Sequence, residues 1–116
     1  MDKTVYINVA QQIGEPSALT QEQGNIIFEK IESAINNDQQ IRLDFSQVES
    51  MISPFLNNAI GQLYGKYNSE QISKYLIIEN FPDEKKSTLN IVIANAKRYY
   101  QNKTEYNSIA EGVINS

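Results

Sequence analysis

The stretch Gln40–Leu63, QIRLDFSQVESMISPFLNNAIGQL, places a predicted strand directly before a predicted helix. Over Ile41–Phe45 apolar residues alternate with polar ones, which is the period of a strand. The step Ser53–Pro54 predicts the start of a helix, because serine is favoured at the N-cap and proline at the first helical position. Apolar residues then recur at helical spacing as far as Tyr67. The stretch therefore predicts a strand followed by a helix, with Ser53 at the corner between them.

The same two periods recur on both sides of this stretch. Residues 4–10 alternate like a strand. The continuous apolar run at residues 75–78 predicts a strand that is buried on both faces of a parallel sheet. Residues 20–36 have helical spacing, and Thr20 and Gln23 are placed as a capping box at its start. The chain thus continues to alternate between strand and helix.

Three further segments complete the predicted order. Residues 11–18 contain a glycine and a proline and predict a loop or a short edge strand. Helical spacing covers residues 89–100, and residues 106–114 predict a short packed helix. This alternation predicts an α/β fold: a mostly parallel or mixed sheet of about four strands with helices packed against it. The length of 116 residues predicts a single domain over residues 1–116.

The composition argues against several kinds of site. The chain has no cysteine and no histidine, so thiolate chemistry and the commonest general base and metal ligand are absent. Its 10 basic and 14 acidic residues give a net charge of −4, and the basic ones are scattered, which argues against a nucleic-acid surface. The sequence shows neither a signal peptide nor an apolar run of the roughly 20 residues that span a membrane. We therefore expect a cytoplasmic protein that is not an enzyme and holds no cofactor or metal ion.

Ser53 has two interpretations on these grounds. As an N-cap it would contribute about 1 kcal/mol to helix stability and need no further role. As a hydroxyl at the sheet edge it would also be a place for a phosphate, whose charge the helix dipole favours. Asp44 ends the preceding strand, and such a carboxylate more often bonds nearby backbone amides than performs acid–base or metal chemistry. A catalytic role for Ser53 or Asp44 would require a deep pocket in which carboxylates and Lys66 converge.

The run Ile41–Leu63 resembles the central segment of the STAS-like family, small bacterial domains related to the anti-sigma factor antagonists. The features that carry the resemblance are the LDF strand, the apolar link after it, and Ser53 at the start of a helix that contains Gly61. The resemblance extends roughly over residues 4–80 and implies a STAS-like α/β domain.

In the antagonists this corner carries a serine that a partner kinase of the histidine-kinase ATPase fold phosphorylates, and the phosphate switches partner binding. By position, the resemblance puts this serine at Ser53. The motif around it differs from that of the antagonists: Ile52 replaces an aspartate, Pro54 a second serine or threonine, and Phe55 a glycine, whereas Leu56 matches. Pro54 also removes a backbone donor that would hold a phosphate.

We therefore expect a non-catalytic regulatory module that binds a protein partner, with no role for nucleic acid or membrane. The resemblance implies a histidine-kinase-fold ATPase or a similar anti-sigma-like regulator as the partner and Ser53 as the phosphoacceptor. The expected partner-binding residues are Ser50, Ser53, Pro54, Phe55, Asn57 and Asn58. The alternative is a self-associating structural subunit, such as a homodimer, that uses the apolar stripe of residues 106–114 or the exposed helix faces.

Overall fold

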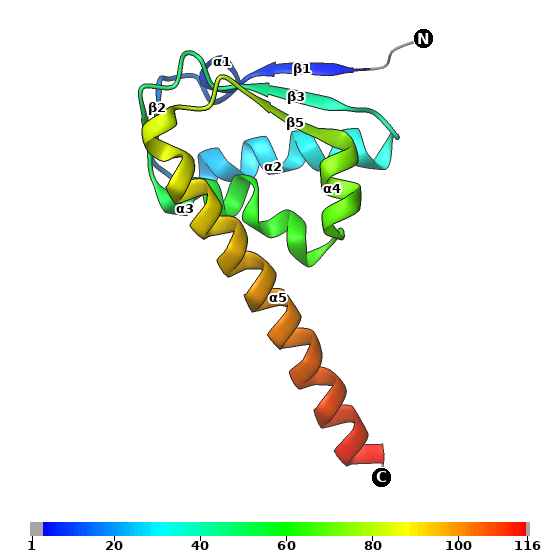
Figure 1. Cartoon of the computed structure of the whole chain (residues 1–116). Coiled ribbons are helices and arrows are strands. Elements are labelled where there is room, and N and C mark those ends of the chain that lie inside the picture. The colour runs from blue at the N-terminus through cyan, green and yellow to red at the C-terminus, as the bar shows by residue number, and fades with distance from the viewer. Residues whose placement is uncertain (1–3, 116) are drawn as a thin grey trace.

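Three parallel strands form the main sheet of the protein (Figure 1). The computed structural model describes the backbone of residues 4–115 and the side chains of residues 4–101. In this part of the chain, β1 (Val5–Asn8), β3 (Ile41–Asp44) and β5 (Leu76–Glu79) pair in the order β1-β3-β5. The predicted α/β class with parallel strands is confirmed.

A separate pair of two short strands lies beside this sheet. β2 (Ser17–Ala18) pairs in parallel with β4 (Ser50–Met51). The prediction of one sheet of about four strands is therefore wrong. Residues 11–18 were expected to form a loop or a short edge strand. They do contain the strand β2, which pairs with β4 in the link after β3 and not with the main sheet. Pro16 O accepts hydrogen bonds from Glu49 N at 2.8 Å and from Ser50 N at 3.3 Å, which fixes this pairing.

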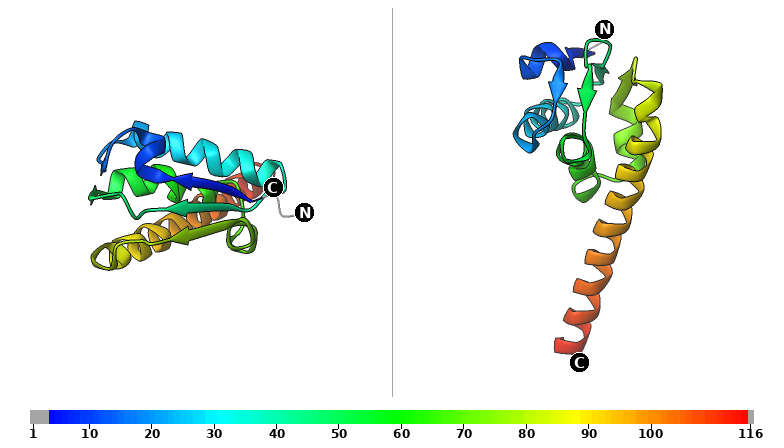
Figure 2. Two further views of the ribbon diagram at one scale, coloured as in Figure 1. Left: turned by 90° about the horizontal axis from the view of Figure 1, so that it is seen from above. Right: turned by 90° about the vertical axis from the view of Figure 1, so that its left-hand side faces the viewer.

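Helices cover one face of the main sheet. The helices of the described chain are α1 (Val9–Ile13), which lies at the end of β1, and α2 (Gln21–Asn36), α3 (Ser53–Ala59), α4 (Ser69–Tyr75) and α5 (Lys86–Asn115), with short 3-10 helices η1 (Gly61–Gly65) and η2 (Asp83–Lys85). Figure 2 shows α2, α3 and α5 on the same side of the strands. Right-handed crossovers that always add the next strand in the same direction place their helices on one face. None of the helices of residues 4–115 combines the length and the apolar character that crossing a membrane requires.

The core lies between the sheet and this helical layer. Alternate residues of the central strand, Ile41 and Leu43, are completely buried against it. Burying a side chain of this size contributes about 1.5–3 kcal/mol relative to leaving it in water. The other large, fully buried side chains are Val9, Ile27, Ile31, Phe45, Phe55, Leu56, Ile60 and Leu63.

The start of α2 and its packing against α3 are built from two sequence features. The predicted capping box is confirmed: Thr20 Oγ1 accepts from Gln23 N at 3.1 Å, and Gln23 Oε1 accepts from Thr20 N at 3.0 Å. Gly24 then lets α3 come close. A Cβ at this position would lie 2.6 Å from Phe55 O and 2.8 Å from Asn58 Cβ, closer than real Cβ atoms come.

Two local predictions fail because of capping residues. Residues 9–13 form α1, where strand and loop were expected: Asn8 Oδ1 accepts from Gln11 N at 3.1 Å, and Gly14 ends the helix with a φ of 87°. Residues 69–75 form α4, which was not predicted. Its capping box joins Asn68 and Gln71, so the predicted strand begins one residue late, after Tyr75.

Three other elements differ from the prediction. The helix that was expected to run from Ser53 to Tyr67 ends at Ala59 and is followed by η1. β5 is half-buried instead of buried on both faces, because it is an edge strand with one uncovered face. The two helices expected at the C-terminus are the single α5. The side chains of the predicted stripe at 106–114 lie outside the described residues.

The uncovered face of the sheet carries polar and aromatic side chains. The register places Tyr6 beside Arg42, and Asp44 beside Glu79. Arg42 donates to Glu79 Oε2 at 3.3 Å, and its guanidinium lies 5.9 Å from the centroid of the Tyr6 ring. Tyr6 remains 69% exposed. This face therefore takes no part in the core.

Candidate functional site

The strand-to-helix corner, residues 50–58, lies on the side of the molecule toward which the three strands of the sheet point (Figure 1). Open α/β sheets commonly place their binding sites at this edge. The corner is held by the β2–β4 pair, in which Met51 lies beside Ala18. Ile52 N also donates to Ala18 O at 3.2 Å. The backbone that leads into α3 is therefore fixed on one side by hydrogen bonds.

Ser53 is the first residue of α3 and not its N-cap, so the predicted cap is wrong. Ile52 occupies the N-cap position with extended backbone angles, and no side chain caps the helix. Its carbonyl accepts from Leu56 N at 3.3 Å. Ser53 is exposed, and its hydroxyl makes no hydrogen bond within residues 4–101. Helix capping therefore does not explain the serine at this position.

The six residues predicted to bind a partner do not share one surface. Ser50, Ser53 and Pro54 are exposed. Phe55 has no exposed surface and packs in the core, so a partner does not reach it in this conformation, which corrects its place in the expected surface. The ring belongs to the buried side of α3 together with Leu56.

The two asparagines of the corner have different roles. Asn58 is half-buried and ties α3 to α2, since its Nδ2 donates to Gln21 O at 3.3 Å and to Asn25 Oδ1 at 3.1 Å. Asn57 is exposed and lines a groove between α3, η1 and α5 that also contains Asn95. The exposed part of the corner is thus formed by Ser50, Ser53, Pro54 and Asn57.

Beside Ser53 lies an apolar pair that the sequence did not reveal. Leu19 is 45% exposed and Ile52 is 39% exposed. They are the residues that directly follow the paired positions Ala18 and Met51, so both lie where the chain leaves the β2–β4 pair. Pairing of two-residue strands that are far apart in the sequence has no periodic signal. The available hint is that Leu19 precedes the N-cap of α2 and that Ile52 is the N-cap of α3.

Hydrogen bonds from Ser46 and Asn80 hold the carboxylate of Asp44. Its carboxylate accepts from Asn80 Nδ2 at 3.0 Å, from Ser46 N at 2.9 Å and from Ser46 Oγ at 3.0 Å. These bonds, led by that of Asn80, hold the pKa of Asp44 below its ordinary value. The carboxylate joins the loops that follow β3 and β5, as the interpretation of a backbone-bonding aspartate predicts.

Lys66 does not contact Asp44 and forms an ion pair with Glu32 of α2. It donates to Glu32, and this hydrogen bond raises the pKa of Lys66. Its ammonium also lies 5.5 Å from the centroid of the Phe28 ring. Within the described chain, no group of three or more His, Cys, Asp or Glu residues is arranged to hold a metal ion. A catalytic role for Ser53 or Asp44 would require carboxylates and Lys66 to converge in one pocket. In the described residues, Lys66 pairs with Glu32 and Asp44 bonds Ser46 and Asn80, so they do not converge.

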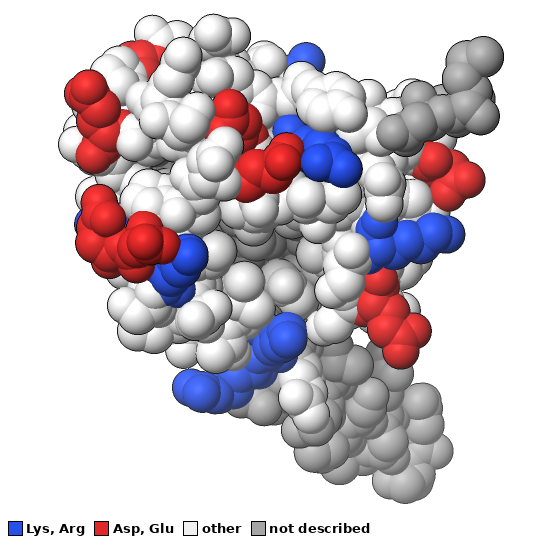
Figure 3. Space-filling view, turned by 45° about the horizontal axis from the view of Figure 1, so that its top comes forward, with Lys and Arg blue, Asp and Glu red and all other residues white. Residues whose placement is uncertain are grey.

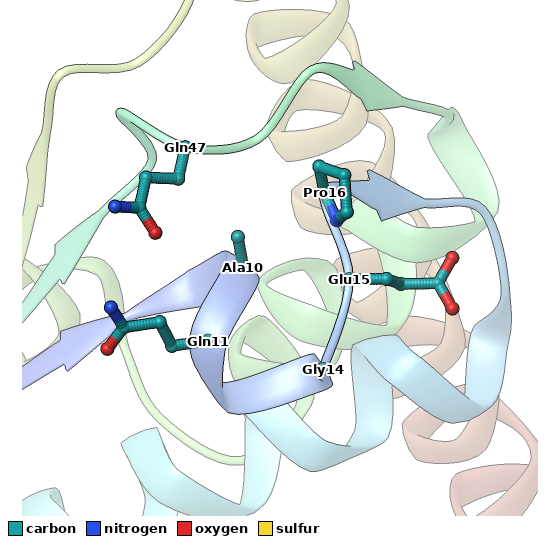
Figure 4. Close-up of a pocket in the computed structure, with 6 residues that line it drawn as sticks. All are labelled: Ala10, Gln11, Gly14, Glu15, Pro16 and Gln47. Atoms are coloured by element: carbon teal, nitrogen blue, oxygen red, sulfur yellow. The ribbon is translucent and has the colours of Figure 1, made fainter.

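A hollow of about 590 Å³ lies next to α1 and the loop that follows it (Figure 4). Its polar side chains are the amides of Gln11 and Gln47, while the carboxylate of Glu15 points away from them. Amides donate and accept hydrogen bonds but do not transfer protons near neutral pH. The residues that line the hollow are Ala10, Gln11, Gly14, Glu15, Pro16 and Gln47.

Charged side chains are mixed on the face of the molecule that Figure 3 shows, and no large basic area forms there. Several of the basic groups are paired. Arg42 contacts Glu79 at 3.3 Å and Lys86 contacts Asp83 at 2.7 Å. This distribution gives that face neither the concentrated positive charge of a nucleic-acid surface nor a single-sign field.

A known family resembles the central part of this chain. The model of a family described as a STAS-like domain of unknown function matches residues 23–86. The matched range contains β3, the corner, α3, α4 and β5, whereas nearly all of α5 lies beyond it. No curated protein and no solved structure matches the chain.

Proposed function

Since this chain belongs to the family of STAS-like domains, we propose that it is a non-catalytic regulatory module that binds a partner protein through the strand-to-helix corner. The observation that carries this proposal is the exposed pair Leu19 and Ile52 beside the exposed Ser53. Apolar surface removed from water on binding contributes about 25 cal/mol per Å². Binding sites for proteins commonly have an apolar centre and a polar rim. Here Leu19 and Ile52 are the centre, and Ser50, Ser53 and Asn57 are the rim.

The proposed switch is a phosphate on Ser53. The hydroxyl is accessible and free of intramolecular hydrogen bonds in the described chain, so a kinase would not have to break a cap to reach it. A phosphate would add a charge of about −1.5 to −2 next to Leu19 and Ile52. Pro54 offers no N–H to bind it. The phosphate would therefore oppose an apolar contact at the corner and release the partner.

The proposed partner is a histidine-kinase-fold ATPase or a similar anti-sigma-like regulator. This part of the proposal is supported by the resemblance of residues 41–63 to the anti-sigma factor antagonists, whereas the family match supports the STAS-like domain alone. The corner differs from theirs at residues 52, 54 and 55, so the contact would use side chains other than the aspartate and glycine of that motif.

The test compares three tagged proteins expressed in the native host: wild type, Leu19→Asp/Ile52→Asp, and Tyr6→Asp. Tyr6 is a matched control because it is exposed but lies on the uncovered face of the sheet. We expect the double variant to recover at least tenfold less of the partner than the other two proteins. Circular dichroism melts verify that all three are folded. Equal recovery of the partner by all three would rule out the corner as the binding surface.

The phosphate is tested separately on the wild-type protein. Intact mass and a phosphopeptide map should place a single phosphate on Ser53, and Ser53→Glu should reduce partner recovery whereas Ser53→Ala should not. A chain that is never modified, or is modified elsewhere, would remove the switch and leave the binding surface.

A further inference from the structure

The hollow beside α1 adjoins the strand-to-helix corner. Pro16 lines the hollow, and its carbonyl accepts the hydrogen bonds from Glu49 N and Ser50 N that fix the β2–β4 pairing. Gln47 lines it from the loop between β3 and β4. Leu19 follows Pro16 by three residues, which span about 10 Å when extended at about 3.3 Å each. A bound segment of about four extended residues therefore reaches from the hollow to the apolar pair of the corner.

Two glutamine amides in the hollow have no partner in the part of the chain that the structure describes. Gln11 comes from α1 and Gln47 from the loop after β3, and Figure 4 shows both side chains reaching toward the same side of the hollow. Neither side chain makes a hydrogen bond within residues 4–101. By contrast, Gln23 and Gln71 complete capping boxes. Gln11 and Gln47 therefore offer two NH₂ donors and two carbonyl acceptors to a ligand.

Backbone hydrogen bonds hold both walls of the hollow in place. Ala10 O accepts from Gly14 N at 2.9 Å and from Glu15 N at 3.0 Å, which fixes the turn out of α1. Val48 N donates to Phe45 O at 3.0 Å and closes the turn after β3. The hollow is thus formed without a ligand, as binding sites commonly are, and its volume of about 590 Å³ is within their usual range. Binding there requires little ordering of the chain.

The chemistry of the lining favours an uncharged ligand that forms hydrogen bonds. No lysine, arginine or aromatic residue is among the described residues that line the hollow. A phosphate or carboxylate would therefore find no opposite charge, and a nucleobase would find no ring on which to stack. A cation would find no carboxylate, because that of Glu15 points away (Figure 4). A peptide bond, with one N–H and one C=O, matches the donors and acceptors of the two amides.

We propose that the partner bound at the corner lays an extended segment into this hollow and that Gln11 and Gln47 bind its main chain. Each amide donates to a peptide carbonyl of the segment or accepts from a peptide N–H. Ala10 and Pro16 supply the apolar surface against which the segment lies. This inference rests on the function proposed for the corner, since the segment belongs to the same partner protein.

The segment is extended because only an extended main chain has groups to offer to the two amides. A helix bonds its own N–H and C=O groups internally and would leave both glutamines without partners. In extended peptides, hydrogen bonds to the main chain give affinity, whereas contacts of the side chains give specificity. The hollow therefore binds the segment irrespective of its sequence, and the contact with Leu19 and Ile52 selects the partner.

The first test repeats the partner-recovery experiment with Gln11→Met and Gln47→Met. Methionine keeps the length of glutamine and removes its amide. We expect each variant to recover about fivefold less of the partner than the wild type, which is the typical effect of losing one hydrogen bond. Gln39→Met is the matched control, because Gln39 precedes β3 at the other end of the sheet and should leave recovery unchanged. Circular dichroism melts verify that the variants are folded.

The second test titrates the wild-type protein with the capped tripeptide acetyl-trialanine amide and follows the side-chain amide signals by NMR. We expect saturable shifts of the Gln11 and Gln47 signals as the peptide rises to about 10 mM. The Gln71 signals should not move, because that amide completes the capping box of α4. An analogue in which an ester oxygen replaces the central peptide N–H should bind at least about threefold more weakly, since it lacks one donor.

The two experiments separate failure of the hollow from failure of the corner, because the titration requires no partner. Full partner recovery by Gln11→Met and Gln47→Met, with loss of the partner by Leu19→Asp/Ile52→Asp, would overturn the hollow and leave the corner as proposed. Unshifted glutamine signals, or an ester analogue that binds as tightly as the peptide, would also overturn the hollow. Loss of the partner by the glutamine variants but not by the corner variant would overturn the segment shared between the two surfaces.

Discussion

Gly24→Ala should destabilise the protein although alanine is the better helix former. Alanine in place of an interior helical glycine contributes about 1 kcal/mol. The added Cβ, however, would lie 2.6 Å from Phe55 O and 3.1 Å from Ala59 N, which are backbone atoms of α3 and cannot rotate away. Overpacking of this kind costs about 1–3 kcal/mol, and contact with backbone favours the upper end. We expect a net loss of about 2 kcal/mol in the free energy of unfolding.

Urea unfolding followed by circular dichroism measures this loss, which corresponds to a fall in Tm of about 10 °C. Ser33 supplies the matched control, because it is exposed on the same helix. Ser33→Ala should be more stable than Ser33→Gly by about 1 kcal/mol. The glycine-to-alanine difference should thus have opposite signs at positions 24 and 33. Equal or greater stability of Gly24→Ala compared with the wild type would refute the close approach of α2 and α3.

Two further predictions concern hydrogen bonds seen in the structure. Thr20→Ala removes the acceptor of the α2 capping box and should cost about 1 kcal/mol in urea unfolding, whereas Thr20→Ser should retain most of it. Asp44→Asn should flatten the acid dependence of stability. Because the pKa of folded Asp44 is below that of the unfolded chain, its carboxylate stabilises the fold above about pH 4 and loses this effect as the pH falls through the folded value. Unfolding curves between about pH 6 and 2.5 should therefore converge for wild type and Asp44→Asn at the acid end, and parallel curves would show that Asp44 is not the titrating group.

The sequence predicted those elements in which local and tertiary preferences agree. β3 and the start of α2 appeared as expected, since alternation of apolar residues and the Thr20–Gln23 capping box are local signals. The helix after Ser53 is shorter than its apolar spacing predicts. Gly61 and Gly65 face α5 closely there, with Ala96 Cβ 3.6 Å from where a Cβ of Gly61 would lie. Sequence spacing alone contains no information about such a distant partner.

The sequence predicted where the candidate site lies better than it predicted which side chains form its surface. The corner around Ser53 is exposed and lies at the edge of the sheet, but Phe55 is in the core and Asn58 ties two helices together. Burial at a helix start depends on the direction in which the helix leaves the strand, which no single residue type determines. The apolar pair Leu19 and Ile52 depends on the β2–β4 register, and two residues are too few to show strand alternation.

Because helices pack against only one face of the main sheet, the two faces of the sheet differ in how well they tolerate substitutions. Helices α2, α3 and α5 all lie on one side of the strands, and Ile41 and Leu43 are buried against them. Substitutions of either residue therefore alter the packing of the core. On the opposite face, no described helix packs against side chains such as Tyr6. Exposed positions such as Tyr6 can therefore be substituted at little cost in stability, and a new recognition surface can be selected or engineered around them without redesigning the interior.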